Sequence, residues 1–152
     1  MRSKAPLALM EQMVMLLVFA LASALCLQAF VKSDAISFKN GNRSKAALEA
    51  QNTAEAIQHC GGDLEHALAG AGELLGTVPK DGKIRISYDD DWAVTEKEGS
   101  FYLEAAGIPT DIPGLQKASV QVFDNNSMAG DDAKSGLLFA IEVAWIEEDI
   151  NE

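Results

Sequence analysis

The side chains best suited to chemistry form two small groups in the second half of the chain. His59, Cys60 and His66 could supply nitrogen and sulfur ligands, and Asp89-Asp90-Asp91 is a run of carboxylates. A structural zinc site needs four ligands, and two glycines interrupt the first group, so the spacing does not predict zinc binding. Oxygen ligands suit calcium, but no glycine-bearing loop of the EF-hand type follows the aspartates. We expect a solvated turn there, with calcium binding as the alternative.

A second acidic stretch, Asp124 to Asp132, has calcium-compatible residue types but lacks the EF-hand order. Beyond these groups the sequence contains no Gly-x-Ser-x-Gly, no phosphate-binding P-loop and no HExxH motif. Carboxylates lie close together in many places because the chain is acidic. We therefore predict that the protein is not an enzyme and uses no metal and no cofactor.

The charge distribution divides the chain into two parts. The first 31 residues contain three charged side chains: Arg2, Lys4 and Glu11. The remaining residues carry ten Lys and Arg against twenty-two Asp and Glu, a net charge near −12. Such an acidic surface repels nucleic acid and anionic lipid headgroups, so we expect no nucleic acid as a partner.

An apolar segment from Leu7 to Val31 is long enough to cross a membrane. Its 25 residues would span about 37 Å as a helix, against about 30 Å of hydrocarbon. The basic residues before it place residues 1–6 in the cytoplasm and the rest of the chain outside. Ala22-Ser23-Ala24 could be cleaved as a secretory signal, but the apolar run continues past it. Leu25 argues against a lipoprotein at Cys26. We predict an uncleaved or N-terminally trimmed anchor.

Glu11 is the one carboxylate of the anchor. A charge well inside a bilayer costs a few kcal/mol unless it is paired, protonated or close to the interface. Glu11 could snorkel to the cytoplasmic surface, or it could pair with a group on a neighbouring subunit.

The run from Leu7 to Leu17, with Glu11 near its start, resembles the N-terminus of type IV pilins and type II secretion pseudopilins. In that family a basic leader precedes an apolar helix whose fifth mature residue is glutamate. The glutamate is thought to meet the amine of the adjacent subunit during assembly. Ala54-Glu55-Ala56 and the stretch Gly61 to Leu68 are similar to the end of the long helix in some pilin-like proteins of Gram-positive bacteria.

The resemblance makes Glu11 the assembly residue, and Pro6 and Leu7 the candidate processing site. The family's prepilin peptidase normally cuts after glycine, and Pro6 stands in that position. Cleavage by this peptidase therefore does not follow from the resemblance, and the chain could keep its leader.

The pattern beyond the anchor predicts a helical region over residues 32–76. The polar stretch Lys32 to Asn42 suggests a kink with Gly41 as its weakest point, and Arg43 to Cys60 reads as helix with a small apolar face. That face includes Ala46, Ala50, Ala54, Ile57 and Leu48. Gly61-Gly62 should end this helix, and Asp63 should cap a second one reaching about Ala71.

Residues 77–152 read as the sheet region of the same domain. Alternating apolar residues predict four strands: Lys83–Tyr88, Phe101–Ala106, Ser119–Phe123 and Leu137–Ile146. One face of this antiparallel meander needs a cover, and the helix from Arg43 to Cys60 is the available layer. Trp92 and Trp145 are expected in the packing. The predicted class is α+β, with a long N-terminal helix packed on a four-stranded sheet.

Two functions are compatible with this layout. The first is a structural, pilin-like or pseudopilin-like subunit of a type IV pilus, competence or type II secretion-like assembly, with the membrane and similar subunits as partners. The second is a membrane-tethered extracytoplasmic binding or sensor module that binds calcium or a protein. A secreted small domain would follow from signal cleavage.

Overall fold

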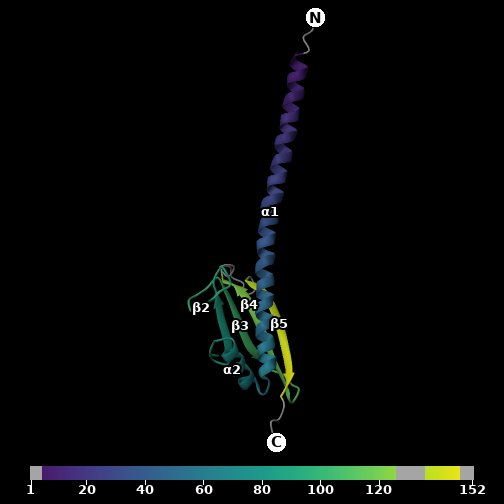
Figure 1. Ribbon diagram of the computed structural model, residues 1–152. Coiled ribbons are helices and arrows are strands. Elements are labelled where there is room, and N and C mark those ends of the chain that lie inside the picture. Colours follow the sequence, from purple (N-terminus) through teal and green to yellow (C-terminus); the bar gives the residue numbers. More distant parts are fainter. Residues whose placement is uncertain (1–4, 126–135, 148–152) are drawn as a thin grey trace. The chain divides into compact units, whose positions relative to one another are not determined.

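The computed structural model describes residues 5–125 and 136–147, and it describes only the backbone of Ala5, Pro6 and Leu7. The chain forms two compact units, Met1–Gly41 and Asn42–Glu152. Helix α1 (Ala5–Cys60) supplies all the described structure of the first unit and the first layer of the second (Figure 1). The predicted α+β class is confirmed.

Helix α1 shows no break where a kink was expected. Every residue of the stretch 32–42 is helical, and the boundary between the two compact units falls directly after Gly41, so the kink expected there stays a prediction. Glycine destabilises a helix interior by about 0.5–1 kcal/mol but does not remove a hydrogen bond, as proline would.

The turn after α1 follows the predicted chemistry. Gly61 and Gly62 adopt φ values of 58° and 74°, a region that glycine enters without steric cost. The Asp63 carboxylate then accepts a hydrogen bond from the backbone N–H of His66 at 2.7 Å. This cap begins helix α2 (Leu64–Leu74), which runs three residues further than expected.

The second unit contains a five-stranded antiparallel sheet in the order β2-β1-β3-β4-β5. The strands are β1 (Lys83–Tyr88), β2 (Val94–Thr95), β3 (Phe101–Ile108), β4 (Leu115–Asp124) and β5 (Leu137–Ile146). The four predicted strands are present, and β3 and β4 are longer than expected. The additional β2 pairs two residues with the end of β1.

Strand β2 returns along β1 through a tight turn that the alternation of apolar residues does not reveal. The Asp89 carboxylate accepts hydrogen bonds from the N–H groups of Asp91 and Ala93, at 3.0 and 2.9 Å. Trp92 adopts a φ of 64°, which is unusual for a bulky residue. Its ring stacks on Phe101 with 4.4 Å between centroids, and this packing holds the unfavourable backbone in place.

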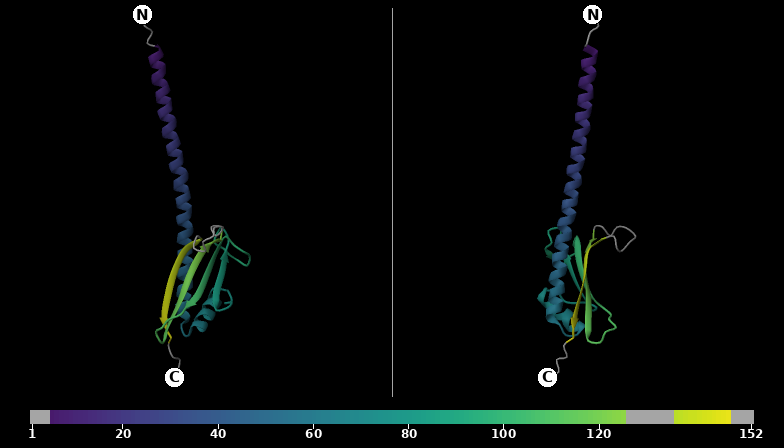
Figure 2. Two further views of the ribbon diagram at one scale, coloured as in Figure 1. Left: turned by 180° about the vertical axis from the view of Figure 1, so that it is seen from behind. Right: turned by 90° about the vertical axis from the view of Figure 1, so that its right-hand side faces the viewer.

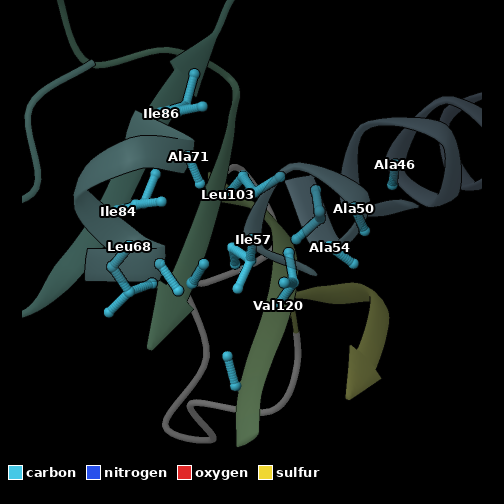
Figure 3. Packing of buried hydrophobic residues seen from close by; sticks show 14 of the residues in the cluster. Ala46, Ala50, Ala54, Ile57, Leu68, Ala71, Ile84, Ile86, Leu103 and Val120 are labelled. Atoms are coloured by element: carbon cyan, nitrogen blue, oxygen red, sulfur yellow. The ribbon is translucent and has the colours of Figure 1, made fainter. Parts of the chain in front are cut away.

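The interior lies between one face of the sheet and the C-terminal part of α1, with α2 closing one end (Figures 2 and 3). The helix contributes mainly small residues, so its backbone can approach the sheet closely. Its fully covered residues are Ala46, Ala50, Thr53 and Ile57. From the sheet, Ile84, Leu103 and Val120 point toward them and are completely buried.

Of two apolar residues that were expected in the packing, one is exposed and one is buried. Leu48 was expected on the packed face of α1 but is 49% exposed. It lies two residues from both Ala46 and Ala50, which places it about 200° around the helix from each. Trp145 is buried as expected, and its indole N–H donates to the carbonyl of Gly62 at 2.8 Å. This bond ties β5 to the turn between the helices.

Candidate membrane and assembly segment

The first half of α1 presents large apolar side chains that nothing else in the described chain covers. Their exposed fractions run from 57% at Val14 to 77% at Phe30. The side chains are Leu9, Met10, Met13, Val14, Met15, Leu16, Leu17, Val18, Phe19, Leu21, Leu25, Leu27, Phe30 and Val31. A patch of this extent exceeds what water-exposed proteins normally tolerate, so the segment requires an apolar environment or partner.

By length and composition α1 contains a candidate membrane span close to its N-terminus. The apolar stretch covers all sides of the helix, with no polar stripe of the kind that surface helices show. A helix of this type satisfies its own backbone hydrogen bonds, as hydrocarbon requires. The sequence-based prediction of a segment able to span a bilayer is therefore supported at this level.

Glu11 lies on α1 and its side chain is exposed. Within the described residues it has no hydrogen bond and no ion pair. Pro6 and Leu7, the candidate processing site, lie in the first turn of α1, where proline is tolerated because its missing N–H would have no helical partner. The basic residues Arg2 and Lys4 are outside the described residues.

The two cysteines are distant in sequence and lie in different environments. Cys26 is exposed among the apolar side chains of α1, and Cys60 is half-buried at the helix end. Cys60 packs against Gly70, where a Cβ would come within 2.8 Å of the sulfur. Within the described residues both thiols are free, and no group of three potential metal ligands occurs.

The aspartate run after β1 builds a turn. Asp89 caps the turn as described above, and Asp90 accepts a hydrogen bond from the Ser100 hydroxyl at 2.5 Å. Two of the three carboxylates thus have protein partners, which accounts for their types without a cation. The other acidic loop, Asp124 to Asp132, lies mostly outside the described residues.

A group of charged and aromatic residues on the sheet face away from α1 was not anticipated. Glu104 on β3 forms ion pairs with Lys83 at 3.0 Å and Arg85 at 2.5 Å, both on β1. The Arg85 hydrogen bond, with Lys83 adding to it, lowers the pKa of the Glu104 carboxyl. Tyr102 stacks on Phe123 with centroids 4.9 Å apart. The alternation of the sequence predicts that these residues share one face of the sheet. Which of them pair across strands follows only from the strand register.

Tyr88 links the sheet to α1 through a buried hydroxyl. Its O–H donates to the Glu49 carboxylate at 3.4 Å, and the ring lies 5.7 Å from that of Trp92. Burial, and then the Glu49 charge, raise the pKa of the Tyr88 hydroxyl well above its usual value of 10.0. Nearby, the Trp92 indole N–H donates to the side-chain oxygen of Asn42 at 3.4 Å.

We expect this hydroxyl to make the fold sensitive to alkali. Above about pH 10 the unfolded chain loses the Tyr88 proton while the folded chain retains it, so unfolding is favoured by up to about 1.4 kcal/mol per pH unit. Below that pH the contribution is constant. Urea unfolding of the full chain and of Tyr88→Phe at about pH 8 and 11 measures it. The variant should lose less stability over this interval, and equal losses would contradict the assignment.

Comparison with known proteins identifies no relative. No protein-family model, no curated protein and no solved structure matches this chain.

Proposed function

We propose that the apolar half of α1 anchors the chain in a membrane and that the protein is a pilin-like or pseudopilin-like structural subunit. The observation that supports this most is the division of one continuous helix. Its first part exposes apolar side chains all round, and its last part packs on an antiparallel sheet. An apolar helical segment that continues into a helix-on-sheet domain is also the layout of the family that the N-terminal sequence resembles.

The proposed orientation has residues 1–6 in the cytoplasm, Leu7–Val31 in the bilayer and the rest outside. It rests on Arg2 and Lys4, which precede the apolar segment, because cytoplasmic flanks carry an excess of Lys and Arg. The acidic second unit agrees with this, since its charge disfavours contact with anionic inner-leaflet lipids.

Cysteine labelling tests the orientation. In a chain with Cys26→Ser and Cys60→Ser, a cysteine is introduced at the exposed Glu96 or at Ser3. A membrane-impermeant maleimide applied to intact cells should label Glu96→Cys and leave Ser3→Cys unlabelled until the cells are opened. The reverse pattern would exclude an extracytoplasmic domain.

Glu11 is proposed to set the register between neighbouring subunits. An unpaired carboxylate in hydrocarbon is costly, so contact with a cationic group of an adjacent copy would stabilise an assembled array. The N-terminal amine of the adjacent copy, or its Lys4 if the leader is retained, could supply that cationic group. Pro6 and Leu7 mark where processing would occur, and mass spectrometry of the N-terminus decides between these sources.

A photo-crosslinking amino acid at Met13 tests the assembly. Copies in the membrane should give a ladder of crosslinked species, and Glu11→Gln should weaken it several-fold because the charge that pairs adjacent helices is lost. Glu55→Gln, which removes an exposed carboxylate from the same helix in the second unit, is the matched control and should leave the ladder intact. Monomer alone in the parent chain would refute a polymerising subunit.

A membrane-tethered binding module is the second candidate function. The observation in its favour is the open edge of the sheet along β5. The aspartate turn adds little support for calcium, because Asp89 and Asp90 already accept hydrogen bonds.

A further inference from the structure

Strand β5 forms one edge of the sheet, and its outer side has no partner strand among the described residues. It pairs with β4 along its whole length and is ten residues long, about 34 Å. In Figures 1 and 2 it is the last strand on its side of the sheet. An edge of this kind presents a row of backbone N–H and C=O groups that can bind another strand.

The register of β4 and β5 shows which backbone groups face outward. The N–H of Glu147 donates to the carbonyl of Gly114, one step beyond the Leu115–Ile146 pair. In an antiparallel ladder hydrogen-bonded pairs alternate, so the odd-numbered residues from Phe139 to Trp145 point their backbone groups at β4. The even-numbered residues point theirs outward. These are Ala140, Glu142, Ala144 and Ile146, and all four are exposed.

This edge lacks the devices that usually prevent strand addition. Strand β5 contains no lysine, arginine or proline, and Glu142 is its one charged residue. The opposite edge, formed by β2 and β1, has features that hinder strand addition. There β2 is two residues long, and Lys80 pairs with Lys83 so that part of the outer side of β1 is occupied. The asymmetry singles out β5 as the side of the sheet that can accept a strand.

Charge determines which kind of strand fits. Glu142 lies opposite Ser119 of β4 and has no ion pair within the described residues. A second copy of β5 is a poor occupant. The antiparallel two-fold pairings with the longest overlap set the two Glu142 side chains opposite or diagonal to each other, and like charges there are destabilising. A basic side chain opposite Glu142 is stabilising instead.

We propose that β5 is a docking edge for an extended segment of a partner protein that adds as a sixth strand. The outward backbone groups of Ala140, Glu142, Ala144 and Ile146 bind its main chain. On one face the segment carries a lysine or arginine opposite Glu142, beside the small Ala140 and Ala144. On the other face it carries apolar residues that extend the row of Ile141 and Val143.

Fluorescence anisotropy with the full chain in detergent micelles tests this edge. The probe is a labelled ten-residue peptide that alternates valine and threonine, with one central threonine replaced by lysine. It should bind about three- to tenfold more tightly than the same peptide with a central glutamate. In the Glu142→Lys chain this preference should reverse. Glu96→Lys, which places the same change beyond the opposite edge, should keep the original preference.

Two further measurements identify the main-chain pairing. A peptide N-methylated at every residue cannot donate main-chain hydrogen bonds to β5 and should show no binding. Ala144→Pro removes an outward N–H without touching the β4 ladder, so it should weaken binding at least tenfold at an unchanged melting temperature. Binding that survives N-methylation, or shows no charge preference, overturns the proposal. Loss of peptide binding as the chain concentration rises would identify a second copy as the occupant and overturn it too.

Discussion

Arginine at both Leu17 and Leu21 should release the chain from the membrane fraction. Each arginine near the centre of a spanning helix costs about 2.5–3.5 kcal/mol to insert, and each lost leucine removes a favourable contribution. Together they disfavour insertion by roughly 6 kcal/mol, about four orders of magnitude in the equilibrium. Both positions are exposed and belong to the first unit, so the second unit should fold unchanged.

The measurement is carbonate extraction followed by detection of the chain in the pellet and the supernatant. The matched control places the same two charges further along the helix, at Ser33 and Ser37, beyond the apolar segment. That variant should stay in the pellet. If the double arginine at Leu17 and Leu21 also stays there, Leu7–Val31 is not the anchor.

Gly99→Ala should be the most damaging small substitution in the second unit. A Cβ at Gly99 would lie 2.0 Å from the backbone oxygen of Tyr88 and 2.6 Å from its carbonyl carbon. Backbone at the end of β1 cannot move aside, because β2 and β3 hold it on both sides. We expect a loss of at least about 3 kcal/mol, the range of severe overpacking.

Urea unfolding of the full chain in detergent, followed by the fluorescence of Trp92 and Trp145, measures this loss. Ser100→Ala introduces the same residue one position along and removes only the hydrogen bond to Asp90, so it should cost about 1 kcal/mol. A Gly99→Ala chain as stable as the control would show that this close approach is absent from the protein.

The sequence predicted the layers of the fold well because each layer has a strong local pattern. Alternation over Lys83–Tyr88 and Leu137–Ile146 gave β1 and β5 at their observed bounds. The ends of β3 and β4 were missed because Gly107, Ile108 and the stretch Leu115 to Ala118 do not alternate, although register with their neighbours continues there.

Other features depend on contacts that no local pattern contains. Strand β2 is held by the Asp89 turn and by the stacking of Trp92 on Phe101. Glycine is required at Gly99 because the backbone of Tyr88, eleven residues earlier, leaves no room for a Cβ. For the candidate assembly site, the sequence supplied Glu11 and the apolar segment, whereas the open β5 edge emerged from strand order.

The hydrogen bond from Trp145 to Gly62 can form only late in translation, because β5 is the last strand to be made. The interior is nearly complete in sequence by Val122, yet its last large side chain, Trp145, is synthesised well over eighty residues after Ile57. At about 5–20 residues per second, α1 waits on the order of ten seconds for the strand that fastens its end. During translation β4 is therefore the edge strand of an unfinished sheet, and its outward backbone N–H and C=O groups are open to a chaperone until β5 is made.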